Sequence, residues 1–164
     1  MAVEDVDFDI AAANDDIRRL HRAWQERRAG RPYPAGADID LASFHFARDY
    51  LSLIEICQKP WRFRYRMVAA GVTRHLGYEM TGHDVEDVPE PETRAYVKLL
   101  YTRAVWKRAP LYEKGRITLD GRRWDHETLV LPLSSDGETI DMLLIYRKAT
   151  VRQEGESAVT EAAR

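Results

Sequence analysis

The first regular pattern along the chain is a narrow apolar stripe at helical spacing on an otherwise charged segment. The stripe consists of Ile17, Leu20 and Trp24. Asn14 or Asp15 can cap the free backbone N–H groups before it, and Gly30 lies where such a helix would end. The pattern predicts a helix over residues 17–29, whose stripe must be buried against the chain's own sheet or against a second subunit.

Two strands are predicted next, on either side of Lys59-Pro60. Residues 50–57 are largely apolar and branched, which favours a strand. In the segment WRFRYRM, residues 61–67, basic and apolar side chains alternate, and a period of two is typical of a strand with one wet face. The wet face would carry Arg62, Arg64 and Arg66, and the buried face would carry Phe63, Tyr65 and Met67.

Two helices are predicted in the middle of the chain. A short one covers residues 72–76, before Gly77, and a longer one runs from Glu92 or Thr93 to Arg108. The longer helix has one broad apolar face, formed by Val97, Leu100, Tyr101, Ala104 and Val105 and widened by Tyr96 and Trp106. A face of this width indicates a helix that packs on the core.

The C-terminal part has the pattern of an antiparallel meander. Asp120-Gly121, a two-residue hairpin signal, separates strands predicted over 116–119 and 122–133, and a second turn leads to a strand over 139–149. The last strand is apolar without alternation from Met142 to Tyr146, which indicates that both its faces are covered. We therefore expect an α+β fold: a five-stranded antiparallel sheet with the long helix on one face and the N-terminal helix, or a second subunit, on the other.

Composition fits one ordinary domain, since the chain has 164 residues of which 45% are hydrophobic. We expect an acidic leader over residues 1–14, the domain over 15–149 and a flexible tail over 150–164. The formal net charge of −2 gives no overall attraction to nucleic acid or to an anionic membrane. The arginines of the N-terminal helix are therefore interpreted first as a solvated face, with nucleic-acid contact as the alternative.

Cys57 is the single cysteine, which excludes an intramolecular disulfide and a zinc site built on thiolates. The N-terminus lacks the basic-then-apolar order of a secretory signal. No apolar run approaches the roughly 20 residues that span a bilayer. We expect a cytoplasmic protein without a membrane partner.

A series of short motifs accompanies this order of elements. They are Trp24 in the first helix, Arg64-Tyr65-Arg66, Gly77-Tyr78, Thr81-Gly82 and Leu131-Pro132-Leu133-Ser134 followed by Asp136-Gly137. Over residues 15–149 the series resembles the PAS domain family, and more closely its stand-alone bacterial members. The resemblance implies a signalling module that senses a small molecule, mediates protein contact, or both. We expect it to act as a homodimer.

Two departures from the family pattern narrow this expectation. Many PAS domains carry an asparagine before the short helix, where this chain has Ala69. The flavin-binding light sensors of the family need a cysteine in an Asn-Cys-Arg context on a helix, whereas Cys57 lies in a predicted strand. The resemblance therefore implies no photoactive flavin adduct, and the cofactor stays unknown. The remaining residues hold no output domain, so a signal would pass to an unidentified signalling protein by contact.

The five histidines form no metal-binding motif with another histidine, a cysteine or a carboxylate. His75 or His83 could ligate haem, as in some PAS sensors, but a surface or hydrogen-bonded histidine is the simpler interpretation. Asp125-His126-Glu127 resembles an acid–base cluster. On a strand, however, the carboxylates point away from the histidine, so we expect no catalytic residue, no metal ligand and no enzyme.

An interior cavity is the remaining candidate site, and a solid aromatic core is the alternative. The candidate lining residues are Phe63, Tyr65, Met67, Tyr101, Trp106, Met142 and Leu144. In the last strand this choice assumes that Asp141 points outward. The candidate interface with a second subunit or partner is the stripe Ile17, Leu20 and Trp24.

Two other functions are alternatives to a sensor. The first is a small cone-shaped α+β enzyme of the isomerase or dehydratase type, which would need a buried carboxylate or histidine in its pocket. The second is a regulator that binds nucleic acid through the arginine-rich first helix, although the net charge makes nucleic acid a less favoured partner.

Overall fold

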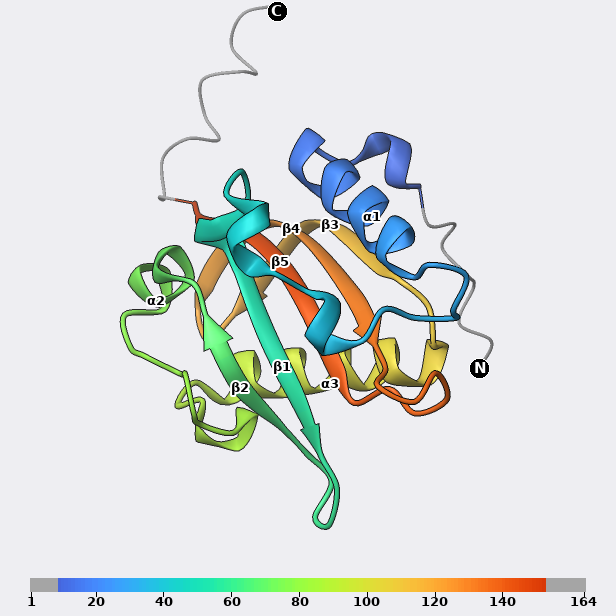
Figure 1. Cartoon of the computed structure of the whole chain (residues 1–164). Helices are drawn as coiled ribbons and strands as arrows, with labels where there is room; N and C mark the ends of the chain where they lie inside the picture. The colour runs from blue at the N-terminus through green and yellow to red at the C-terminus, as the bar shows by residue number, and fades with distance from the viewer. Residues whose placement is uncertain (1–8, 153–164) are drawn as a thin grey trace, which may run out of the picture.

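The computed structural model describes residues 9–152, which form a five-stranded antiparallel sheet with helices on both faces (Figure 1). The helices are α1 (Asp15–Arg27), α2 (Ala70–Leu76) and α3 (Pro91–Lys107). The strands are β1 (Leu51–Cys57), β2 (Arg62–Val68), β3 (Leu111–Leu119), β4 (Arg122–Leu133) and β5 (Met142–Val151). The order across the sheet is β2-β1-β5-β4-β3, so the last strand lies in the middle. The expected α+β fold is confirmed.

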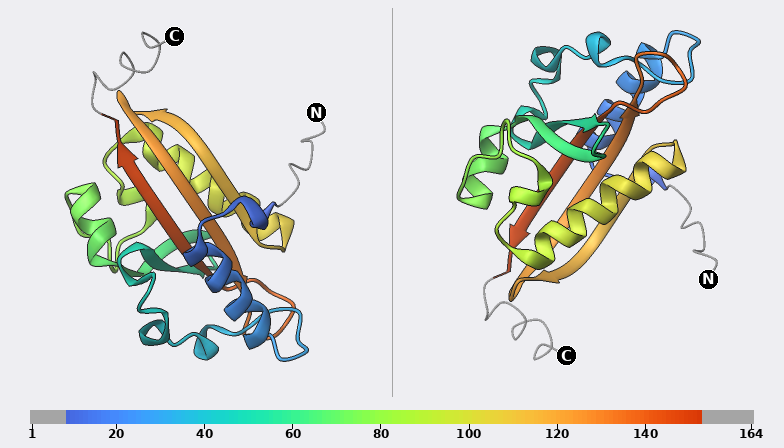
Figure 2. Two further views of the ribbon diagram at one scale, coloured as in Figure 1. Left: turned by 90° about the horizontal axis from the view of Figure 1, so that it is seen from above. Right: turned by 90° about the horizontal axis from the view of Figure 1, so that it is seen from below.

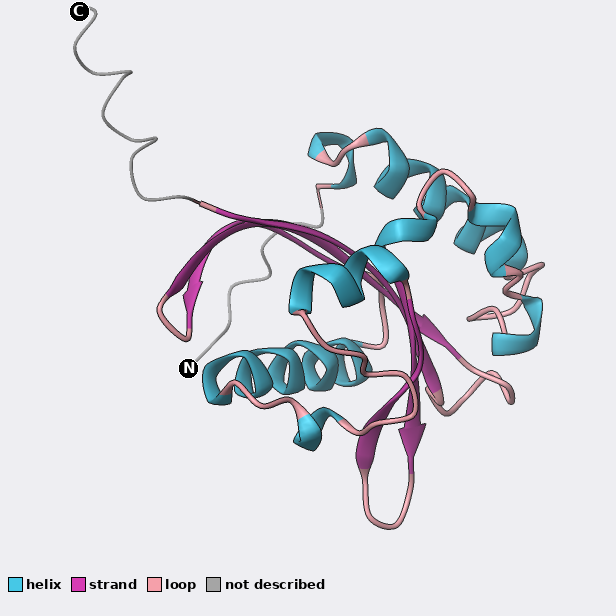
Figure 3. Cartoon of the chain, turned by 90° about the vertical axis from the view of Figure 1, so that its left-hand side faces the viewer, coloured by secondary structure: helices cyan, strands magenta, loops and turns pink. Residues whose placement is uncertain are grey.

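The sheet is curved, and its two faces have different covers (Figures 2 and 3). Helices α2 and α3 lie in the hollow of the sheet, whose face we call the palm, and α1 lies on the opposite face, which we call the back. Ile17 and Leu20 of α1 are fully buried, and the indole Nε1 of Trp24 donates a hydrogen bond of 2.9 Å to the Pro132 carbonyl oxygen. The chain therefore covers the apolar stripe of α1 with its own sheet.

Asn14 fastens the start of α1 to the back of the sheet. Its side-chain oxygen caps the helix by accepting from the Ile17 backbone N–H at 2.9 Å. Its own backbone N–H and side-chain amide donate to the two carboxylate oxygens of Glu127 in β4, at 2.8 and 2.9 Å. One residue thus provides the helix cap and a bond to the sheet.

The ends of the domain differ from the expected bounds. Ala13 is buried, and β5 extends to Val151, so the structured region is longer than 15–149 at both ends. Most of the expected leader and tail, residues 1–8 and 153–164, lies outside the described residues.

A β-bulge changes the predicted alternation of β2. Tyr65 pairs with Ile54 but Met67 pairs with Leu53, which leaves Arg66 as an extra residue in β2. A single extra residue exchanges the two faces of a strand beyond it. Phe63 and Tyr65 therefore face the palm, as their partners do, whereas Met67 lies on the back.

Helix α3 begins beside the β3–β4 hairpin. Asp120 and Gly121 at the turn both have positive φ, 50° and 75°, as the Asp-Gly signal requires. The Asp120 carboxylate accepts from the backbone N–H groups of Glu92 and Thr93 at 3.0 and 2.8 Å. The turn residue therefore also satisfies the first backbone N–H groups of the helix that covers the palm.

The buried face of α3 is narrower than the sequence indicates. Val97, Leu100, Tyr101 and Ala104 are buried, but Trp106 is 80% exposed. Trp106 follows Val97 by nine residues, about two and a half helical turns, which puts it on the opposite side of the helix.

Candidate ligand cavity

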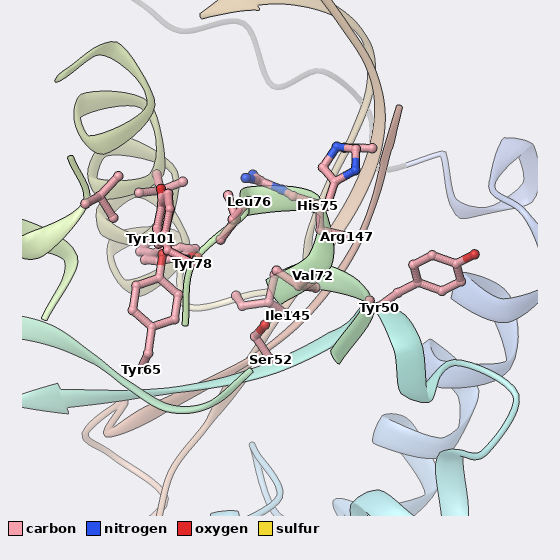
Figure 4. Close-up of a pocket in the computed structure, with 14 residues that line it drawn as sticks. Tyr50, Ser52, Tyr65, Val72, His75, Leu76, Tyr78, Tyr101, Ile145 and Arg147 are labelled. Atoms are coloured by element: carbon pink, nitrogen blue, oxygen red, sulfur yellow. Dashed lines mark hydrogen bonds between the residues drawn. The ribbon is translucent and has the colours of Figure 1, made fainter. Parts of the chain in front are cut away.

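A cavity of about 120 Å³ lies between the palm, α2 and α3 (Figure 4). The sheet contributes Ser52, Tyr65, Ile145, Arg147 and Ala149 to its wall. The two helices contribute Gly71, Val72, His75, Leu76, Val97 and Tyr101. The remaining wall residues are Tyr50, Tyr78 and Val88. Figure 4 shows Tyr65 and Tyr101 together on one side of the cavity, with the Tyr50 ring pointing away from it.

A close backbone contact holds α2 over the palm. A Cβ atom added to Gly71 would lie 2.2 Å from the backbone oxygen of Asp49, closer than any side chain allows. Glycine at this position therefore permits α2 to approach the chain just before β1. The helix ends at Gly77, which has a φ of 85°. This short helix brings Val72 and His75 to the cavity wall.

Arg147 brings a positive charge to the palm from the middle strand of the sheet. Its Nε is 3.3 Å from the Thr128 hydroxyl oxygen, and its guanidinium lies over the Tyr96 ring at 5.2 Å. The Nη2 atom is buried without a hydrogen-bond partner. Within residues 9–152, no carboxylate forms an ion pair with this guanidinium.

Two histidines lie beside this charge. The His75 ring is tilted against Trp124 at 4.6 Å, and its Nε2 is also buried without a partner. Burial lowers the pKa of His75, and Arg122 lowers it further. Burial likewise lowers the pKa of His126, and the nearby Arg147 adds to this effect. Both rings are therefore neutral near pH 7.

Two tyrosine hydroxyls face each other across the interior, with 3.5 Å between the oxygens of Tyr65 and Tyr101. Burial raises the pKa of both groups, so each hydroxyl keeps its proton and can donate. Tyr78, by contrast, already donates to Glu90 at 2.7 Å.

A smaller cavity of about 60 Å³ adjoins the first and shares His75, Leu76, Arg147 and Ala149 with it. Tyr96, Trp124 and His126 belong to its wall. No Asp or Glu lines either cavity in the part of the chain that the structure describes. Glu127, next to His126, points to the back, where it accepts from Asn14 and Tyr112. The side chains of His126 and Glu127 therefore point to opposite faces of β4, as predicted.

The structure brings two of the predicted lining residues, Tyr65 and Tyr101, to the cavity. Phe63 is buried on the same face, against Tyr101 at 5.5 Å between ring centres, but does not line the space. The other predicted residues, Met67, Trp106, Met142 and Leu144, do not line this cavity. The bulge moves Met67 to the back, and Trp106 is on the outer side of α3.

In β5, side chains alternate between the two faces of the sheet, and the sequence prediction chose the wrong set for the palm. Ile145 pairs with Ser52 and faces the palm, so Leu144 and Met142 face the back. Tyr146 confirms this parity, because its hydroxyl lies 3.5 Å from Asp16 in α1. Sequence reasoning missed Arg147 for this reason. Arg147 lies two residues after Ile145 and therefore on the same face of β5, which is a signal that could have found it. A strand covered on both faces, however, has no apolar–polar pattern that shows which face borders the cavity.

The other candidate residues lie away from the cavity. Ile17, Leu20 and Trp24 are buried beneath α1 in the chain's own core. Cys57 is at the end of β1 and is absent from the cavity wall. His83 is exposed and lies 3.5 Å from Asp87. Among the described residues, no group of histidines, cysteines and carboxylates could hold a metal ion.

Comparison with known proteins identifies the family of this chain. A family model described as a PAS domain matches residues 13–146, and the chain belongs to this family. PAS domains are sensor and interaction modules that bind small ligands or other proteins. No curated protein is matched by the chain.

Several solved structures are similar. The PAS domain of BvgS from Bordetella pertussis is 12% identical, with 85% of this chain and 90% of that chain covered and a TM-score of 0.49. The Rhodobacter sphaeroides LOV protein is 15% identical, with 73% and 72% covered and a TM-score of 0.47. The PAS domain of the fruit-fly ELK potassium channel is 13% identical, with 68% and 94% covered and a TM-score of 0.47.

Between residues 9 and 152, none of the helices has the length and apolar character needed to cross a bilayer.

Proposed function

We propose that this PAS domain is a signalling module that holds a small molecule in the palm cavity and passes the signal on by protein contact. The observation that carries the proposal is the pair of buried nitrogen atoms at the cavity without partners, Arg147 Nη2 and His75 Nε2. Buried polar atoms without partners are costly and rare in folded proteins. A bound molecule that forms hydrogen bonds with these two nitrogen atoms would remove this cost.

Ligand binding would act through α2 and α3, because these helices and the sheet share the cavity wall. A bound molecule stabilises one arrangement of the two helices on the palm and so shifts the population of conformers that a partner meets.

The two alternative functions, a small enzyme and a nucleic-acid-binding regulator, have less support. The enzyme would need a buried carboxylate or histidine in its pocket. Among the described residues the cavity walls contain His75 and His126 but no carboxylate that could orient either ring. Arg19 and Arg27 of α1, which the nucleic-acid alternative would use, lie over Phe46 and Phe44 of the same domain.

Native mass spectrometry of the protein purified from its source tests the binding function. We expect a retained small molecule in the wild type and its loss in Val72→Phe, which fills the cavity. Val105→Phe is the matched control, because Val105 is partly buried on α3 but does not line the cavity. A wild type that carries no small molecule and also binds none from a fragment library would contradict the proposal.

A second copy of the chain is our proposed protein partner, through the outer side of α3. Leu99 is 60% exposed and Trp106 is 80% exposed. Trp106 follows Leu99 by seven positions, about two helical turns, so both lie on one side of the helix. This surface replaces the α1 stripe as the candidate interface, since Ile17, Leu20 and Trp24 are already buried.

Sedimentation equilibrium tests this interface. We expect Trp106→Ala to weaken self-association about tenfold or more, because exposed tryptophans often dominate interface energies. Trp61→Ala is the control, since Trp61 is also exposed but lies in the turn just before β2, away from α3. A wild type that stays monomeric at about 100 µM would contradict the dimer, because an association this weak is far below ordinary interface affinities.

A further inference from the structure

We propose that the ligand of the palm cavity is a small monocarboxylic acid whose carboxylate binds Arg147. This inference rests on the proposed sensor function and names the chemical class of its ligand. The apolar body of the acid would lie against Val72, Val97 and Ile145, which form the carbon-rich part of the same wall.

The charge of the cavity is the first argument. Arg147 contributes a positively charged guanidinium, and the described residues of both cavity walls contain no carboxylate to balance it. The two nearby histidines have lowered pKa values and add no charge near pH 7. The wall therefore presents one uncompensated positive charge, which an anion of single charge would balance.

The geometry of the donors is the second argument. Arg147 uses Nε towards Thr128 and leaves Nη2 buried and unpaired. A carboxylate accepts from a guanidinium through two parallel bonds, and such pairs are among the strongest hydrogen bonds in proteins. The hydroxyls of Tyr65 and Tyr101 and the Nε2 of His75 are further groups on this wall that can bond to oxygen.

The size and lining of the palm cavity favour a small carboxylate over a phosphate. The cavity holds about 120 Å³, below the 300–1,000 Å³ of sites for drug-sized molecules and close to an engineered cavity of about 150 Å³ that binds benzene. A single ring or a short branched chain therefore fits. A phosphate dianion would need more charged donors than one arginine, and it has no apolar body for Val97 and Ile145 to contact.

The test compares acids with their amides, which have the same shape and no charge. Isothermal titration calorimetry with benzoate and benzamide, and with isobutyrate and isobutyramide, measures affinity in the full chain. We expect at least one acid to bind about tenfold or more tightly than its amide, and inorganic phosphate to bind more weakly than that acid. Binding of the amides as tight as that of the acids, or preference for phosphate, would overturn the inference.

Variants of the arginine identify the group responsible. Arg147→Gln should weaken binding of the acid about tenfold or more and change binding of the amide by less than about threefold, and Arg147→Lys should restore part of the loss. Arg66→Gln is the matched control, because Arg66 is exposed and forms a loose ion pair of 3.9 Å with Glu55. Equal loss in Arg147→Gln and Arg66→Gln would overturn the assignment to Arg147. The acid–amide comparison needs only the wild type and stays decisive if a variant does not fold.

The outcomes separate the two proposals. If amides bind as well as acids and Val72→Phe abolishes both, the cavity is a ligand site and only the carboxylate inference fails. If neither acids nor amides bind at about 10 mM and the purified protein retains no small molecule, the proposed sensor function fails as well.

Discussion

The two faces of the sheet are built from neighbouring residues of the same strands but differ in how completely they are packed. On the back, Leu144 and Tyr146 of β5 are fully buried beneath α1, whose stripe is buried with them. On the palm, Ile145 and Arg147 of the same strand border a cavity with unpaired buried nitrogen atoms. The back resembles a close-packed protein core, whereas the palm has empty space and buried nitrogen atoms without hydrogen-bond partners. We therefore expect stability to depend more on the back, and the proposed ligand binding to depend on the palm.

The largest expected effect is the loss of packing on the back. Leu20→Ala should destabilise the domain by about 3 kcal/mol, since a fully buried leucine leaves a cavity behind when truncated. Val72→Ala on the palm should cost less than about 1 kcal/mol, because its side chain is partly exposed and borders an existing space. Urea unfolding measures both. Equal losses would remove the contrast between the faces.

A smaller effect is expected where α1 is fastened to the back. Asn14→Ala removes the helix cap and both bonds to Glu127, so we expect a loss of about 1–2 kcal/mol in the free energy of unfolding. Asp15→Ala is the control, because its side chain is 81% exposed and its ion pair with Arg18 is at the surface. The idea of Asn14 as a fastening point would be rejected if the two variants had the same stability.

The palm should show the reverse relation between stability and binding. Arg147→Met removes a half-buried charge that has no ion-pair partner among the described residues, so stability should be unchanged or rise by about 1 kcal/mol. The same variant should lose binding of the carboxylic acid. Thermal unfolding without ligand and calorimetry with benzoate check the two halves. A strong destabilisation would mean that Arg147 serves the fold.

The smallest expected effect is on the pH dependence of stability. The pKa of His126 in the folded domain lies below its ordinary value of 6.5, chiefly through burial. The unfolded chain therefore binds more protons below about pH 6.5, and stability should fall as the pH falls from 7.5 to 5.5. His126→Gln should make this fall shallower. The unfolding free energy measured by urea at several pH values checks it, with His83→Gln, an exposed histidine, as control.

Local signals predicted most of the elements because their causes are local. Asn14 caps α1, Asp120-Gly121 forms the hairpin turn, and β4 has the predicted bounds. Other bounds moved. β3 begins at Leu111, ahead of the predicted start, and β5 begins at Met142, after it. These ends depend on pairing with β4, which extends one strand and leaves the start of the other outside the ladder.

The candidate site was only partly predictable. Tyr65 and Tyr101 reached the cavity as expected, because alternation before the bulge and helical spacing both hold locally. Trp106 could have been excluded from its angle on α3, whereas Arg147 could not have been found by alternation, since β5 is apolar on both faces.

The sequence itself determined the order of helices and strands and the turns between them. It also determined that each face of β5 needs a cover. Each of these features follows from periodicity, capping or turn chemistry within a few residues. The tertiary structure alone decided which face of β5 carries the cavity and on which face Met67 lies. Both depend on strand register, which is set by partners far apart in the chain and by one extra residue in β2.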